Sequence, residues 1–177
     1  LEGREFERGA AYRTSNIREL PESIFHLVYN EDIKNIFGKL ANNIQCQEIF
    51  ITHEYKTDVL TRPNQLHFDR LRSLKVMVYI TDVNERCGPL SMVPKSHKKS
   101  CLLRRQFVNM PYENRLNIVE KHYPHLYEEP KKICGGKGTV IFFDSDVFHL
   151  GGKNEQDHER KIIRSHWYPD SQWRSNS

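Results

Sequence analysis

The pattern of hydrophobic and polar positions predicts four β-strands. Residues 74–83 and 139–143 are almost continuous apolar runs rich in β-branched residues, and turn-forming residues follow the first run and precede the second. Such runs are typical of buried strands. Residues 45–56 and 162–168 alternate less regularly, but they are also rich in β-branched and aromatic residues. We expect these two segments to be strands as well.

Helical periodicity is found near the start of the chain. In residues 30–42, apolar side chains recur at helical spacing, namely Ile33, Ile36, Phe37 and Leu40. Asn30 is placed to cap this helix at its N-terminus. We expect an N-terminal helical segment over about residues 17–43. A polar, partly helical insertion is expected over about residues 101–130.

The order of these elements predicts a mainly β fold. Short strands separated by turns, with helices at the start and in one insertion, favour a β-sandwich or jelly roll over alternating βαβ units. The 177 residues fit one domain, with a strand-rich core over about residues 44–170. Because the first residue is Leu1 rather than methionine, we expect that an N-terminal segment has been trimmed.

Composition and charge narrow the classes of function. Charged residues make up 28% and hydrophobic residues 37%, and no apolar run approaches the roughly 18 residues that a membrane span needs. The net charge of +4 is mild, so nucleic acid is not an expected partner, whereas an anionic small substrate fits better. Small basic clusters, of which Arg104 and Arg105 form one, are expected to be solvated surface. The four cysteines are widely scattered, which favours reduced thiols and a cytoplasmic location.

The chemistry-bearing residues begin with the element His67-Phe68-Asp69. In an extended segment, side chains two residues apart point to the same face, so both can reach one metal ion. This pair alone is weak evidence, because a chain with nine histidines can contain one by chance. The alternative is a surface histidine near an acidic residue.

A second histidine, His149, strengthens the case for a metal site. It follows the predicted strand 139–143 after a short turn, and in a jelly roll this segment can lie beside the first. Two imidazoles and one carboxylate form a facial triad, which holds Fe(II) and leaves three coordination positions open. A structural histidine in the core or in a loop is the alternative for His149.

Two arginines on the last predicted strand are candidates for binding a carboxylate. Arg160 lies eleven residues after His149, and the planar donor fork of arginine suits a dicarboxylate cosubstrate beside the iron. The alternative is an arginine at a strand edge, in solvent or in an ion pair. Arg164 shares the strand face of Arg160 and is the competing candidate.

Taken together, these motifs resemble the phytanoyl-CoA dioxygenase family. The resemblance is carried by His67-Phe68-Asp69, by the run from Thr81-Asp82-Val83 through Gly88-Pro89-Leu90 to Ser96-His97, by the segment from Gly138 to His149, and by Arg160. It covers residues 44–168. It implies a double-stranded β-helix that uses Fe(II), 2-oxoglutarate and O2. His67, Asp69 and His149 then match the iron ligands, and Arg160 matches the arginine that binds the distal carboxylate of 2-oxoglutarate.

The resemblance also suggests positions that line the cosubstrate site. Thr52 and Met77 match two of them. Two residues after the distal histidine, family members often carry a hydroxyl group, but this chain has Gly151. One hydrogen bond to the cosubstrate is therefore in doubt.

The intact carboxylate Asp69 bears on the type of reaction. Related halogenases lack this carboxylate and place chloride in the vacancy, so Asp69 favours hydroxylation, with release of succinate and CO2. Desaturation, ring closure or epimerisation can use the same iron centre.

Substrate contacts are less well defined by the sequence. Lys75, Met77 and Tyr79 alternate onto one strand face and are candidates to line the pocket, with Arg164 as a further candidate. The alternative is that this row faces solvent, which Lys75 favours.

Three other functions are compatible with parts of the pattern. A non-catalytic metal- or 2-oxoglutarate-binding jelly roll fits the missing hydroxyl at Gly151. A nucleic-acid demethylase uses the same triad, but its C-terminal arginine pattern differs from residues 160–164. A zinc hydrolase fits the ligand types but leaves Arg160 without a role.

Overall fold

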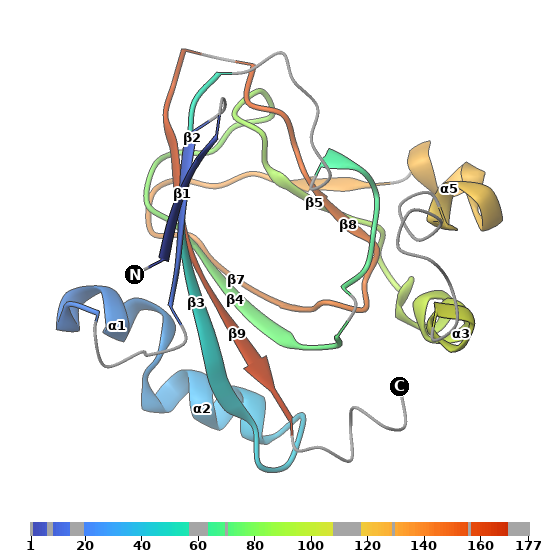
Figure 1. Ribbon diagram of the computed structural model, residues 1–177, viewed down its shortest axis with the longest axis horizontal. Helices are drawn as coiled ribbons and strands as arrows, with labels where there is room; N and C mark the ends of the chain where they lie inside the picture. The colour runs from blue at the N-terminus through green and yellow to red at the C-terminus, as the bar shows by residue number, and fades with distance from the viewer. Residues whose placement is uncertain are drawn as a thin grey trace.

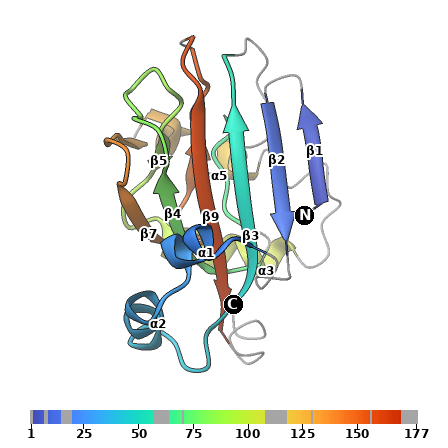
Figure 2. The same cartoon turned by 90° about the vertical axis from the view of Figure 1, so that its left-hand side faces the viewer.

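The computed structural model describes residues 2–6, 9–14, 20–56, 64–69, 71–107, 118–128, 130–155 and 157–169. Their strands form two antiparallel sheets. The larger sheet contains, in spatial order, β1 (Glu2–Phe6), β2 (Gly9–Thr14), β3 (Gln45–Glu54), β9 (Arg160–Tyr168), β4 (Leu74–Tyr79) and β7 (Val140–Asp144). These six strands lie side by side in Figure 2.

The smaller sheet faces the inner side of the larger one. It contains, in spatial order, β6 (Lys131–Ile133), β5 (Leu90–Met92) and β8 (His149–Gly151). Figure 1 shows the two sheets curving around a common interior, with β5 and β8 opposite β3, β4 and β9. This arrangement confirms the predicted jelly roll, a double-stranded β-helix.

Two helices cover the outer face of the larger sheet, α1 (Glu22–Val28) and α2 (Glu31–Gly38) (Figure 1). Ile33 and Phe37 pack with Ile49 and Trp167 in a buried cluster. The side chain of Asn30 accepts a hydrogen bond from the backbone N–H of Ile33 at 2.9 Å, so the predicted N-cap is confirmed.

Helices also cover the outer side of the smaller sheet. These are α3 (His97–Phe107), α5 (Ile118–His122) and the 3-10 helix η3 (Pro124–Glu128). Leu103 of α3 and Val119 of α5 pack against Leu66, Phe68 and Phe148. The predicted insertion is therefore partly helical, and its residues 108–117 and 129 lie outside the described part of the chain.

Because both faces of β4 are covered, the whole strand is buried. Val76 and Val78 point toward the helices and pack with Trp167. Met77 and Tyr79 point into the barrel, where they form a second apolar cluster with residues such as Ile162. Two-sided burial explains why the sequence of β4 is a nearly continuous apolar run.

Some elements differ from the sequence-based expectation. The strands β1, β2, β5, β6 and β8 were not predicted. The predicted strand 74–83 ends at Tyr79, and Val83 makes only an isolated bridge with Gly135. β5, β6 and β8 are three residues long, too short for an alternating pattern to be recognised. Among the described residues, no helix is long and apolar enough to span a membrane.

Candidate metal centre

His67 and His149 lie opposite each other across an antiparallel bridge. The backbone N–H of His67 donates to the carbonyl of His149 at 3.0 Å, and the N–H of His149 donates to the carbonyl of His67 at 2.8 Å. The N–H of Asp69 donates to the carbonyl of Ser145, in the turn after β7, at 3.2 Å. These bonds join two segments that are about 80 residues apart in sequence.

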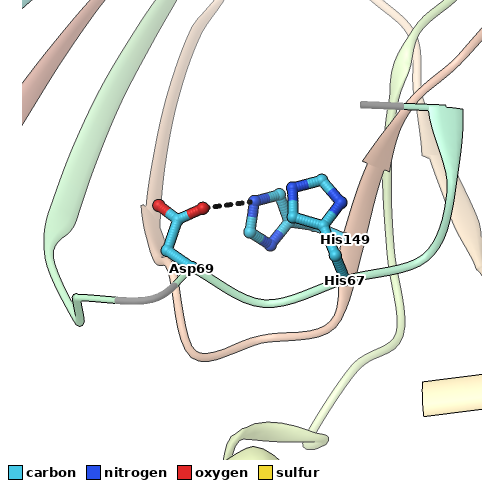
Figure 3. Close-up of side chains that lie close together, drawn as sticks. All are labelled: His67, Asp69 and His149. Atoms are coloured by element: carbon cyan, nitrogen blue, oxygen red, sulfur yellow. Dashed lines mark ion pairs between the residues drawn. The ribbon is translucent and has the colours of Figure 1, made fainter. Parts of the chain in front are cut away.

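The three side chains of the predicted iron site converge (Figure 3). One ligand atom from each of His67, Asp69 and His149 lies within 4.8 Å of the other two. Nε2 of His149 lies 3.7 Å from Oδ1 of Asp69. Two imidazole nitrogens and a carboxylate oxygen at this spacing can bind a divalent cation on one face.

The hydrogen bonds of the two imidazoles select the tautomer that a metal requires. Nδ1 of His67 lies 2.7 Å from the carbonyl of Gln65, and Nδ1 of His149 lies 2.7 Å from the carbonyl of Val147. A carbonyl can only accept, so each Nδ1 carries the proton. In the neutral imidazole, Nε2 is then the nitrogen with the lone pair that can bind a metal, and the backbone fixes the ring orientations.

The charge states also suit metal binding. Burial and the neighbouring His67 together lower the pKa of His149 to about 3, so His149 is neutral at neutral pH. Burial opposes ionisation of Asp69, but attraction to Lys75 and the nearby histidines outweighs burial and holds its pKa far below the usual range. A neutral imidazole and an ionised carboxylate are the forms that bind a metal.

Lys75 is the counter-charge of Asp69. Its ammonium group pairs with Oδ2 of Asp69, on the oxygen that does not face His149. Lys75 is only 3% exposed, so the alternative that its strand row faces solvent is wrong. Burial lowers the pKa of Lys75, whereas the pairing with Asp69 raises it.

Arg104 of α3 contacts the segment of Asp69 directly, a contact that the sequence did not predict. Its guanidinium donates to the carbonyl of Asp69 at 2.8 Å and pairs with the carboxylate of Asp146. Arg104 is 6% exposed, so its assignment to the solvated surface is wrong. The sequence did contain an indication that Arg104 is buried. Ser100, Leu103 and Arg104 have the spacing of residues on one helix face, and this face is buried. The side chain of Arg105 lies outside the described part of the structure.

Arg160 lies in the interior, but a carboxylate of the chain itself already pairs with it. Its guanidinium donates to the carboxylate of Glu54 and to the carbonyl of Gly88. Arg160 begins β9 directly opposite Glu54 on β3. A cosubstrate carboxylate at Arg160 would have to share or replace the Glu54 contact.

The other predicted cosubstrate positions lie along the same interior. Thr52 is opposite Ile162 in the β3–β9 register, and Met77 is buried in the inner apolar cluster. Gly151 pairs with Leu90 in the smaller sheet, and its carbonyl accepts a hydrogen bond from the side chain of Asn64 at 2.7 Å. The structure thus places Thr52, Met77 and Gly151 near the barrel wall, and their roles remain predictions.

The remaining substrate candidates, Tyr79 and Arg164, also face inward. The hydroxyl of Tyr79 donates to the carbonyl of Ile133 at 2.8 Å and accepts from the N–H of Leu90 at 3.2 Å. These bonds tie the two sheets together. The guanidinium of Arg164 lies over the ring of Phe50, 5.0 Å from its centroid.

Comparison with known proteins identifies the family. The sequence profile of phytanoyl-CoA dioxygenase (PhyH) matches residues 8–162. No curated protein sequence matches the chain.

Several solved structures share the fold at low sequence identity. HygX from Streptomyces hygroscopicus with nickel and 2-oxoglutarate bound is 14% identical, with a TM-score of 0.66, and the match covers 97% of this chain and 74% of HygX. The carbocyclase SnoK from nogalamycin biosynthesis is 18% identical, with a TM-score of 0.58, over 92% of this chain and 64% of SnoK. Iron-bound EctD from S. alaskensis is 15% identical, with a TM-score of 0.59, over 90% of this chain and 56% of EctD.

The family match spans most of the chain, and it includes the three converging side chains. The chain therefore belongs to the phytanoyl-CoA dioxygenase family of iron- and 2-oxoglutarate-dependent oxygenases.

Proposed function

We propose that this protein hydroxylates a small molecule, using Fe(II), 2-oxoglutarate and O2 and releasing succinate and CO2. The observation that carries the proposal is the convergence of His67, Asp69 and His149, with Nδ1 of both imidazoles held by backbone carbonyls and Nε2 left as the nitrogen that can bind a metal. A neighbour in fold, HygX, has been crystallised with nickel, 2-oxoglutarate and hygromycin B, which supports a small-molecule substrate.

Each residue has a distinct part in this proposal. His67, Asp69 and His149 hold the iron on one face, and the backbone carbonyls behind the imidazoles keep the rings oriented. Lys75 keeps the second oxygen of Asp69 engaged, so that Asp69 presents one oxygen to the metal. Bound Fe(II) supplies the centre at which O2 is activated while 2-oxoglutarate is oxidatively decarboxylated.

Hydroxylation is the proposed outcome because Asp69 fills the position that halogenases leave to chloride. The fold itself supports other outcomes, since SnoK is a carbocyclase. The free thiols of Cys46, Cys87, Cys101 and Cys134 support the cytoplasmic location expected from the sequence.

The proposal is tested by loading the protein with Fe(II) without oxygen and then adding 2-oxoglutarate, O2 and a substrate library. We expect succinate release that rises in the presence of a true substrate, together with an oxygenated product detected by mass spectrometry. Asp69→Ala should abolish both signals, whereas Asp157→Ala, which changes an exposed carboxylate, should leave them unchanged. A wild-type protein that binds neither Fe(II) nor 2-oxoglutarate would contradict the proposal.

A non-catalytic 2-oxoglutarate sensor is the second candidate. It is favoured by the Glu54 carboxylate on Arg160 and by the absence of a hydroxyl at Gly151. Both features are expected to weaken the binding of 2-oxoglutarate. Binding of 2-oxoglutarate to the Fe(II) protein without succinate release, across a wide library, would favour this second function.

A further inference from the structure

Arg160 and Glu54 form a buried ion pair in the barrel interior. Glu54 ends β3, Arg160 begins β9, and the two residues are directly opposite each other in the register of these strands. Arg160 is 4% exposed and Glu54 is 9% exposed. Charged groups that are removed from water to this degree need a partner of opposite charge. Each residue of the pair supplies such a partner to the other.

The guanidinium of Arg160 also lies close to the segment that follows His149. Its Nη1 donates to the carbonyl of Gly88. Gly88 packs directly on Gly152, because a Cβ atom added to Gly88 would lie 2.5 Å from the carbonyl oxygen of Gly152. Gly152 comes directly after β8, the strand that begins with His149. This position suits the role suggested by the family resemblance, in which Arg160 binds the distal carboxylate of 2-oxoglutarate.

Glu54 contacts the guanidinium nitrogen that every bidentate carboxylate needs. A carboxylate can accept two hydrogen bonds along either of two guanidinium edges, Nε with Nη2 or Nη1 with Nη2. Nη2 belongs to both edges, and in this protein Nη2 of Arg160 donates to Oε2 of Glu54. Nε of Arg160 is buried and has no hydrogen-bond acceptor within the described part of the chain. A carboxylate that binds Arg160 through two hydrogen bonds must therefore use the nitrogen that Glu54 already contacts.

Two carboxylates on one guanidinium nitrogen repel each other. The single positive charge of Arg160 compensates one carboxylate, and repulsion between the two is strong in a buried site because little water screens it. Binding of the distal carboxylate of 2-oxoglutarate therefore weakens or breaks the contact between Glu54 and Arg160. A 2-oxo acid with an uncharged distal end makes no such demand, so Glu54 stays in place when that acid binds.

We propose that Glu54 is a specificity-determining residue of the cosubstrate site, because its carboxylate competes with the distal carboxylate of 2-oxoglutarate for Arg160. The inference rests on the proposed function for the identity of the ligand. Glu54 lowers the preference of the site for 2-oxoglutarate over 2-oxo acids that lack a second carboxylate. In the protein without cosubstrate, Glu54 compensates the charge of Arg160 and joins β3 to β9.

A purely structural role of Glu54 has different consequences for ligand binding. In both cases Glu54→Gln leaves Arg160 buried without its counter-charge, so the ligand-free variant is less stable than wild type. If the ion pair only holds the two strands together, the variant gains no affinity for any acid. If Glu54 competes, a carboxylate from solution takes its place at Arg160, and the variant gains affinity for dicarboxylates alone.

The test compares binding affinities by calorimetric titration of the Ni(II)-loaded protein. Wild type, Glu54→Gln and Glu54→Asp are each titrated with 2-oxoglutarate and with 2-oxobutyrate, which lacks the distal carboxylate. Glu159→Gln is the matched control. Glu159 directly precedes Arg160 in the sequence, but its side chain is 51% exposed and pairs with Lys161.

We expect Glu54→Gln to bind 2-oxoglutarate about tenfold or more tightly than wild type and to bind 2-oxobutyrate with unchanged affinity. Glu54→Asp should show a smaller gain, because the shorter side chain keeps the charge but withdraws it from Nη2. This variant gives the same distinction if Glu54→Gln does not fold. Glu159→Gln should match wild type for both acids. The inference is overturned if neither Glu54 variant binds 2-oxoglutarate more tightly than wild type.

Titration of the metal-free protein with glutarate separates this inference from the proposed function. Glutarate has two carboxylates but no keto group, so it tests the competition at Arg160 without a metal. Tighter binding of glutarate by Glu54→Gln, in a protein that neither binds Ni(II) nor chelates 2-oxoglutarate, would refute the oxygenase and support the competition. Equal affinity of Ni(II)-loaded wild type and both Glu54 variants for 2-oxoglutarate would leave the oxygenase intact and refute the role of Glu54.

Discussion

At the scale of single residues, Lys75 shows how the negative charge of Asp69 in the proposed iron site is neutralised when no metal is bound. The ionised Asp69 is partly buried, and such a carboxylate needs a positive neighbour. Lys75 of β4 supplies that charge, on the oxygen turned away from His149. A divalent cation would supply a second positive charge on the other oxygen.

Lys75→Met should therefore destabilise the metal-free protein by about 2–3 kcal/mol, since it leaves a partly buried carboxylate without its partner. Ni(II) should restore much of this loss, so the metal-induced stabilisation should be larger in the variant than in wild type. Urea unfolding with and without Ni(II) measures both quantities, and the exposed Lys137→Met serves as control. An identical loss with and without metal would contradict this account.

His166 makes the stability of the protein depend on pH. Burial, assisted by Lys75, lowers its pKa to about 3, whereas an unfolded histidine has a pKa of about 6.5. Between these values the unfolded chain binds a proton that the folded protein excludes, so the free energy of unfolding falls as pH falls from about 6.5 toward 3.

His166→Gln should reduce this slope by up to one proton, or about 1.4 kcal/mol per pH unit. Urea unfolding of the metal-free protein between pH 7.5 and pH 5 measures the slope. His125→Gln, at an exposed position, should retain the wild-type slope. His149 adds a similar dependence in both proteins, so only the difference between variants reports on His166. Equal slopes would show that His166 is not the responsible group.

The sequence predicts the iron ligands at residue level because their types and spacing are set by the metal. The sequence does not determine whether Lys75, Met77 and Tyr79 face the barrel interior or the solvent. A lysine in an alternating row is usually read as solvent-facing, and only the second sheet, contributed by distant residues, buries it. The pairing of Arg160 with Glu54 is equally hidden, because it depends on the register of β3 against β9.

At the scale of elements, α3 links the insertion to the metal site through Arg104. One guanidinium contacts both the backbone of Asp69 and the side chain of Asp146, in the turn that leads to His149. A single helix thus braces the two segments that carry the proposed iron ligands.

Arg104→Met should weaken metal binding by about tenfold, the lower end of what the loss of a supporting contact to a metal ligand costs. Arg104→Lys keeps the charge but cannot reach both partners with a planar fork, so we expect an intermediate effect. Metal affinity measured by competition with a chelating dye checks both, with Lys98→Met at an exposed position of α3 as control. Wild-type affinity in Arg104→Met would show that α3 does not brace the site.

Element prediction succeeds where one pattern extends over enough residues. The helix begins after Asn30, as its capping residue and apolar spacing predict, and the long apolar runs are β4 and β7. β5, β6 and β8 are stabilised as strands by pairing with one another in the smaller sheet. Each is only three residues long, which is too short to show a periodic pattern of hydrophobic residues.

At the scale of the whole molecule, the fold places the three proposed iron ligands where the two sheets meet. His149 belongs to the smaller sheet, while the Asp69 segment is joined to the turn after β7 of the larger one. A metal bound by all three ligands would cross-link these segments in the folded state only. Binding must then stabilise the fold by mass action.

We therefore expect Ni(II) at 100 times its dissociation constant to raise the free energy of unfolding by about 2.7 kcal/mol, and a chelator to reverse the gain. Hydrogen exchange should show where the metal stabilises the protein. We expect slower exchange in residues 64–69 and 145–151 and little change in α1 and α2. Asp69→Ala should lose both effects, and Asp157→Ala should keep them. Stabilisation of equal size in Asp69→Ala would mean that the metal binds elsewhere on the chain.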